Sequence, residues 1–102
     1  MKFRRLAAAD QEIKVAADWY DDLIPGLGDD FVAEVEAVLA RVREHPMLYG
    51  RLQNFGGRDD VRHCPLERSP YFINYRTRPE EILVVAVSHA RRKPFYWLER
   101  LS

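Results

Sequence analysis

The feature that most constrains the fold of this chain is a change of period near its middle. Up to Pro46, apolar residues recur three and four positions apart, which is the spacing of amphipathic helices. Beyond a Gly56-Gly57 loop they form short runs rich in Val, Ile, Tyr and Phe, which are typical of strands. Helices followed by strands predict an α+β domain.

The first half predicts a helical hairpin. One helix runs from Ala8 to a Pro25-Gly26 stop, and a second opens at the acidic pair Asp29-Asp30 and closes before Pro46. A short Pro/Gly turn between two helices makes them antiparallel neighbours. We expect three aromatic side chains of these helices in the core: Trp19, Tyr20 and Phe31.

The second half predicts a β-meander of three strands, at 61–68, 70–76 and 82–89, with a loop at 77–81. The last two runs are apolar on both faces, which indicates a covered central sheet with the helices on one side. Residues 2–6 suit a short edge strand, and Pro94 favours a last helical turn over 95–101. The predicted order is β-α-α-β-β-β, in one domain spanning 1–102.

Length and composition exclude several classes of protein. The 102 residues are 47% hydrophobic, enough for one core but not for two domains. Cys64 is the single cysteine, so neither an internal disulfide nor a cysteine-based zinc cage can form. The sequence holds no apolar run of transmembrane length and no secretory signal, so we expect a cytoplasmic protein without a membrane partner.

The charge of the chain is zero overall but divided between its halves. Residues 1–50 hold six Lys and Arg against ten Asp and Glu, and residues 51–102 hold the reverse. A positive side can meet phosphates or an acidic protein partner. Most of the cations are Arg, which suits bidentate contacts to carboxylates and phosphates, although an Arg-rich coding bias explains the same excess.

Five short segments also stand in a particular order: Asp18-Trp19-Tyr20, Gly26-Leu27-Gly28-x-x-Phe31, Pro46-x-x-Tyr49, Arg68-x-Pro70-Tyr71-x-Ile73-x-Tyr75 and Ala86-Val87-x-His89-x-x-Arg92-x-Pro94-x-Tyr96-Trp97. Together they resemble the RelE/ParE toxin superfamily over residues 10 to 97, and most closely its ParE-like branch. Two positions depart from the common pattern, because Ser69 replaces a Phe and His63 replaces an Arg.

The resemblance implies the toxin of a type II toxin–antitoxin module, with the β-α-α-β-β-β fold and a cognate antitoxin as partner. It implies growth inhibition and plasmid stabilisation, and it allows a heterotetramer or a higher toxin–antitoxin complex. One branch of the superfamily cleaves messenger RNA on the ribosome, whereas the other poisons DNA gyrase by protein contact. We expect the gyrase branch, with ribosome-dependent RNA cleavage or a degenerate, non-toxic antitoxin-binding module as alternatives.

A ribonuclease would need a base, an acid and cations that hold the phosphate. The candidate base is His89, with Tyr96 stacking on a nucleotide base and three cations for the phosphate: Arg62, Arg68 and Arg92. His89 has a competing interpretation, in which it only holds the turn after its strand by hydrogen bonds to the backbone. Neither a cofactor nor a metal is expected, because His63, Cys64 and His89 form a poor zinc signature.

Contacts with a protein partner are expected on the basic face. The candidates for partner binding are Arg62, Arg68, Arg91, Arg92, Tyr96 and Trp97. The run Arg91-Arg92-Lys93 has a competing interpretation as a solvated loop. We expect an antitoxin segment to lay an amphipathic helix against the hairpin and to point carboxylates at the basic face, whereas Arg100 is expected to be a rim cation of little effect.

Overall fold

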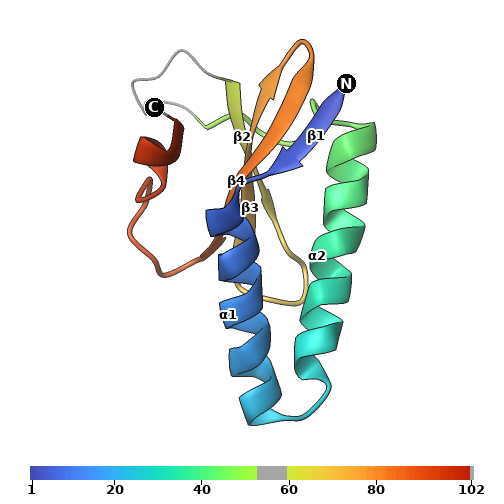
Figure 1. Cartoon of the computed structure of the whole chain (residues 1–102), viewed down its shortest axis with the longest axis vertical. Helices are drawn as coiled ribbons and strands as arrows, with labels where there is room; N and C mark the ends of the chain where they lie inside the picture. Colours follow the sequence, from blue (N-terminus) through green and yellow to red (C-terminus); the bar gives the residue numbers. More distant parts are fainter. Residues whose placement is uncertain (53–59, 102) are drawn as a thin grey trace.

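The computed structural model describes residues 1–52 and 60–101, so the Gly56-Gly57 loop lies outside the described residues. It confirms the α+β class and the predicted order of elements (Figure 1). The elements are β1 (Lys2–Arg5), α1 (Ala7–Leu23), α2 (Leu27–Glu44), β2 (Asp60–Pro65), β3 (Tyr71–Arg78), β4 (Glu81–His89) and the 3₁₀ turn η1 (Leu98–Leu101).

The four strands form one sheet in the order β1-β4-β3-β2. β2, β3 and β4 are antiparallel and confirm the meander, and β1 adds to β4 in parallel. The predicted 77–81 loop is shorter than expected, because Thr77 and Arg78 continue the pairing of β3 and leave only Pro79 and Glu80 to turn the chain. The strand predicted over 61–68 ends at Pro65, where the chain bends toward Tyr71.

The turn between the helices depends on two glycines and one carboxylate. Gly26 has a φ of 97°, a left-handed conformation that side chains disfavour. Oδ1 of Asp21, on α1, accepts hydrogen bonds from the backbone N–H groups of Gly26 at 3.2 Å and Gly28 at 2.7 Å. This carboxylate therefore caps the N-terminus of α2 from the neighbouring helix, and its charge also favours the helix dipole there.

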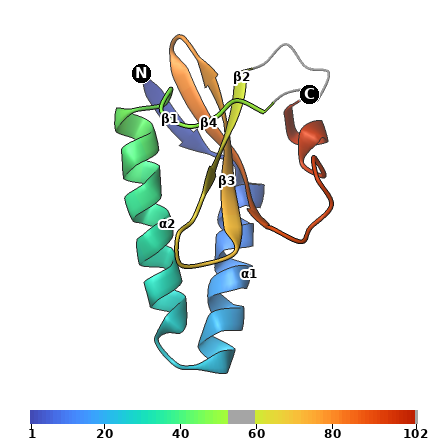
Figure 2. The same ribbon diagram turned by 180° about the vertical axis from the view of Figure 1, so that it is seen from behind.

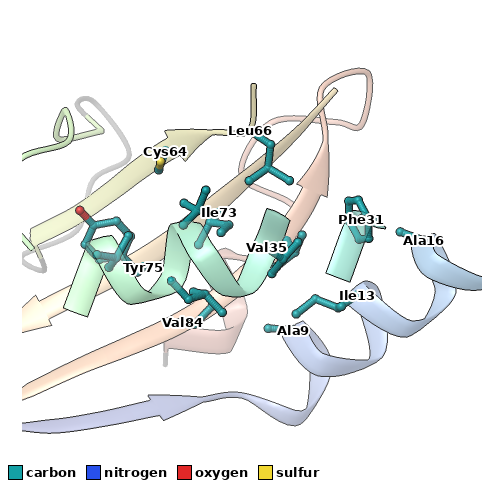
Figure 3. Close-up of a cluster of buried hydrophobic side chains, with 14 of the residues drawn as sticks. Ala9, Ile13, Ala16, Phe31, Val35, Cys64, Leu66, Ile73, Tyr75 and Val84 are labelled. Carbon is teal, nitrogen blue, oxygen red and sulfur yellow. The ribbon is translucent and has the colours of Figure 1, made fainter. Parts of the chain in front are cut away.

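The main core lies between the helical hairpin and one face of the sheet (Figure 3). Both helices present one apolar stripe to it, and β3 and β4 present alternate residues. Tyr75 is fully buried there, and its hydroxyl donates to the backbone oxygen of Pro46 at 2.7 Å. Labelled members of this core are Ala9, Ile13, Ala16, Phe31, Val35, Cys64, Leu66, Ile73, Tyr75 and Val84.

A β-bulge changes the alternation of β4. Tyr75 pairs with Val84 and Asn74 pairs with Ala86, so Val85 is an extra residue in β4. Val84 packs in the main core, whereas Val85 and Ala86 both face the opposite side of the sheet. The bulge breaks the regular ladder and leaves backbone groups there for other partners.

The C-terminal segment, residues 90–101, covers that opposite side (Figures 1 and 2). Trp97 is 3% exposed in a second cluster with Val61, Leu83, Val85 and Ala86. The sheet is thus covered on both faces, as its apolar strands predicted. The helical turn predicted over 95–101 is shorter, because Phe95 has a φ of 60°, which is incompatible with a right-handed helix, and only Leu98–Leu101 is helical.

One expectation for the core is wrong. Tyr20 and Phe31 pack against each other with ring centres 5.3 Å apart, but Trp19 is 56% exposed. The core stripe of α1 runs through Ile13, Ala16 and Tyr20, and one residue is a rotation of about 100° on a helix. Trp19 consequently lies on the flank of α1, where its ring meets the Tyr20 ring edge-on at 5.2 Å.

Candidate functional site

The end of β4 and the C-terminal segment bring four predicted site residues together. One cavity of about 170 Å³, on the side of the sheet away from the hairpin, is lined by His89, Arg92, Tyr96 and Trp97. The floor of this cavity includes Asn74 and Ser88, joined by a hydrogen bond of 2.9 Å, and His63 stacked on Phe72 at 4.6 Å is in its wall. Burial lowers the pKa of His63, which favours the neutral imidazole.

Glu12 of α1 is the centre of a polar cluster beside this cavity. Its Oε1 accepts from the Val87 backbone N–H at 3.0 Å and from Arg100 Nη1 at 2.9 Å. Its Oε2 accepts from the Tyr96 hydroxyl and from Arg100 Nη2, the latter at 3.2 Å. Arg100 Nη1 also donates to the Val85 oxygen at 3.0 Å, so the cluster satisfies backbone groups at the bulge of β4.

The Glu12–Arg100 pair was not foreseen from the sequence. Arg100 was expected to be a rim cation, which is wrong, because its side chain is 21% exposed and that of Glu12 is 13% exposed. The hydrogen bonds that Arg100 donates to Glu12, and the negative charge of Glu12, raise the pKa of Arg100, although burial opposes them. The sequence contains only a weak indication that Glu12 is partly buried, because Glu12 directly precedes the buried Ile13 at the margin of the apolar stripe of α1.

Tyr96 is held in its neutral form by this cluster. Burial, together with the hydrogen bond and charge of Glu12, raises the pKa of the Tyr96 hydroxyl against the opposing charges of Arg92 and Arg100. The guanidinium of Arg92 lies over the Tyr96 ring, 3.7 Å from its centre, and 3.6 Å from Oε2 of Glu12. Because 55% of the Arg92 side chain remains exposed, Arg92 can still meet a partner at this point.

His89 has a hydrogen bond to the backbone in the turn that follows β4. Its Nδ1 accepts from the Arg91 backbone N–H at 3.0 Å, and its ring meets the Tyr71 ring edge-on at 5.1 Å. This is the turn-holding geometry of the competing interpretation, and it leaves Nε2 as the nitrogen that carries the proton of the neutral ring. The Arg91 side chain is exposed beside it.

Arg62, on β2, uses its side chain for contacts within the fold. Its guanidinium donates to the backbone oxygens of Met47 at 3.2 Å and Tyr49 at 2.8 Å, and it pairs with Asp60 at 3.2 Å. Only 13% of the side chain is exposed. Arg62 therefore fastens the segment that follows α2 to the edge of the sheet.

Arg68 lies in the loop between β2 and β3, on the hairpin side of the sheet. Its backbone N–H donates to Glu34 of α2 at 2.7 Å, and its side chain lines a hollow with Asp30, Glu34 and Arg41. Arg62 and Arg68 do not line the cavity that holds His89, Arg92 and Tyr96. The five residues predicted for a nuclease therefore do not converge.

No helix in the described part of the chain has the length and apolarity needed to cross a membrane. Within residues 1–52 and 60–101, no three His, Cys, Asp or Glu side chains gather into a group that could hold a metal ion.

Comparison with known proteins assigns the family. The solved structure of the chromosomal ParDE toxin–antitoxin system from P. aeruginosa superposes with a TM-score of 0.66 at 21% identity, covering 89% of this chain and 97% of that one, which shows a shared fold. No curated protein matches the sequence. Residues 3–94 match the ParE toxin of the type II toxin–antitoxin system, parDE, and the chain therefore belongs to the ParE toxin family.

Proposed function

We propose that this toxin inhibits growth by binding DNA gyrase, without bond-breaking chemistry of its own, and that a cognate antitoxin neutralises it. The ParE family membership supports the toxin role. The observation that carries the choice of target is the dispersal of the nuclease candidates over different parts of the fold.

Cleavage of RNA through its 2′-hydroxyl requires a base, an acid and phosphate-holding cations around one phosphate. Arg62 pairs with Tyr75 of β3, whereas His89 pairs with Tyr71, four residues away. At about 3.4 Å per residue this separates the two positions by about 14 Å along the strands, in addition to the two strand spacings between β2 and β4. The Tyr96 hydroxyl, a second proton-transfer group, already donates to Glu12.

The predicted partner-binding residues divide into two groups. Arg68, Arg91 and Arg92 expose their side chains, and we assign them direct contacts with an acidic partner. Arg62 and Trp97 are engaged within the fold, so we assign them an indirect role, in which they hold the contact surface in place. Tyr96 shares features of both groups. Its hydroxyl donates to Glu12 within the fold, while its ring packs under the exposed Arg92 guanidinium.

Ribosome-dependent RNA cleavage remains the second candidate, because His89, Arg92 and Tyr96 do share a cavity. Primer extension on a translated message, after induction of the wild type or of His89→Ala, separates the two functions. We expect growth arrest with intact transcripts and an equally toxic His89→Ala variant. Cleaved transcripts that depend on His89 would replace the gyrase proposal, and harmless overproduction without antitoxin would indicate a non-toxic binding module.

A further inference from the structure

The cavity between the sheet and the C-terminal segment has room for one aromatic ring. Its volume is about 170 Å³, and a cavity of about 150 Å³ is enough to admit benzene. Phe72 and His63 line it from the sheet, with their rings stacked 4.6 Å apart. Phe95 and Trp97 line it from the C-terminal segment, with ring centres 6.0 Å apart. The lining is therefore rich in aromatic rings, which suits a planar ring as ligand.

The sheet also gives this cavity two polar groups that can take a further hydrogen bond. Asn74 of β3 is 2% exposed, and its Nδ2 donates to the Ser88 hydroxyl at 2.9 Å. Within residues 1–52 and 60–101, no group donates to Asn74 Oδ1, and the Ser88 hydroxyl has no acceptor for its own proton. Buried polar groups are normally paired, so a ligand that supplies both missing partners is favoured. The cavity thus offers one acceptor and one donor close together.

This pair of groups matches the hydroxyl of a phenol. A phenol both donates and accepts hydrogen bonds, so it can donate to Asn74 Oδ1 while it accepts from Ser88 Oγ. A hydrocarbon ring would leave both groups unpaired, and sites that pair a ligand hydroxyl reject the analogue that lacks it. Burial lowers the pKa of His63 beside them, so the neutral imidazole adds no charge to the wall of the cavity.

The rim of the cavity has a moderate positive charge. Arg92 is 55% exposed, and Glu12 lies 3.6 Å from its guanidinium and offsets part of its charge. Lys93 is exposed next to it. A rim of this strength suits one carboxylate. An RNA chain brings a phosphate on each side of every nucleotide and needs further cations, but Arg62 and Arg68 do not line this cavity. The charges therefore favour a protein ligand over RNA.

We propose that this cavity receives one tyrosine side chain of gyrase, whose hydroxyl bonds to Asn74 and Ser88, while a carboxylate near that tyrosine meets Arg92. This inference rests on the proposed binding of gyrase, and it adds the contact site and the side chain that gyrase contributes. His89 also lines the cavity, but its Nδ1 already accepts from the Arg91 N–H, so we assign it no bond to the phenol.

The first test fills the cavity and measures inhibition of gyrase supercoiling. Ser88→Phe places a ring of the chain's own in the cavity and should raise the toxin concentration for half-inhibition at least about 10-fold, because a buried aromatic anchor is a typical hot spot. Ser88→Ala removes only the hydroxyl and should raise it about 3- to 10-fold. The control Ala40→Phe adds the same ring on the exposed face of α2 and should change it less than about twofold.

The second test uses the wild-type chain and p-cresol, which is the side chain of tyrosine. In an NMR titration, p-cresol should shift the amide signals of Asn74, Ser88 and Trp97, and toluene should bind at least about 10-fold more weakly. Uridine monophosphate is titrated in parallel. Tighter binding of this nucleotide than of p-cresol, at the same amides, would overturn the tyrosine site in favour of RNA.

Thermal unfolding shows whether each variant is folded at the assay temperature, and if Ser88→Phe is not, Ser88→Ala and the p-cresol titration decide. Equal inhibition by the wild type and the folded Ser88 variants, or toluene bound as tightly as p-cresol, would overturn the tyrosine site while leaving gyrase as the target. A wild-type chain that binds p-cresol but does not inhibit gyrase would overturn the gyrase proposal and, with it, gyrase as the source of the tyrosine.

Discussion

Replacing Glu12 by Ala should destabilise the fold more than any other change of a carboxylate on α1. Glu12 joins three separate parts of the chain, because it accepts hydrogen bonds from β4 through Val87 and from the C-terminal segment through Tyr96 and Arg100. Without Glu12, the partly buried Arg100 guanidinium loses its carboxylate partner and keeps only the Val85 oxygen among the acceptors in the described part of the chain, and the partly buried Tyr96 hydroxyl loses the oxygen to which it donates.

The size of the effect follows from burial. Breaking a buried ion pair by removing one partner costs about 3 to 5 kcal/mol, because an uncompensated charge is left behind. Arg100 keeps 21% exposure and its hydrogen bond to the Val85 oxygen, so the lower limit, about 3 kcal/mol, applies. For a domain of this size such a loss lowers the melting temperature by about 12 to 15 °C.

Urea denaturation of Glu12→Ala, Arg100→Ala and the double variant measures this effect. We expect the sum of the two single losses to exceed the loss of the double variant by about 1 to 3 kcal/mol, which is the coupling energy of the pair. Glu44→Ala, on the exposed end of α2, should cost less than about 0.5 kcal/mol. A loss below about 1 kcal/mol for Glu12→Ala, or strict additivity with Arg100→Ala, would refute the role of this cluster in holding the C-terminal segment.

Three further predictions concern the fold. Gly28→Ala should cost about 2 kcal/mol in urea denaturation, since the added Cβ would lie 2.5 Å from the Ala17 backbone oxygen. Burial lowers the pKa of His63, so the unfolded chain binds this proton first as the pH falls below about 7, and the melting temperature should drop between pH 7.5 and 5.5 more steeply in the wild type than in His63→Gln. Trp97→Ala should cost about 3 to 5 kcal/mol by thermal unfolding, whereas Trp19→Ser should cost less than about 0.5 kcal/mol.

The fold was predictable where local pattern decides it. The spacing of Ile13, Ala16 and Tyr20 predicts the first helix, and the acidic pair Asp29-Asp30, which lies in the first turn of α2, marks the start of the second. The apolar strands predict a sheet covered on both faces. Trp19 and Tyr20 could not be told apart from the sequence, because hydrophobicity alone does not decide which of two adjacent aromatic residues faces the core. In the structure Tyr20 packs against Phe31, whereas Trp19 is exposed.

The site was predictable only in part. His89, Arg92 and Tyr96 lie close in sequence, and their clustering follows from the turn after β4. The Glu12–Arg100 pair joins residues 88 positions apart, and no local spacing marks such a contact. Arg62 was expected to contact a partner as a cation of the basic C-terminal half, whereas in the structure its guanidinium donates to the backbone oxygens of Met47 and Tyr49 after α2.

The central claim is that this ParE family toxin acts on gyrase by binding, and a supercoiling assay tests it most directly. Relaxed plasmid, purified gyrase and ATP are incubated with increasing amounts of the wild-type chain, and in parallel with His89→Ala. Our account predicts that both proteins inhibit supercoiling and trap cleaved complexes to the same extent, because binding rather than His89 chemistry is responsible. Unchanged supercoiling without cleaved complexes, at toxin in large molar excess over gyrase, would contradict the account.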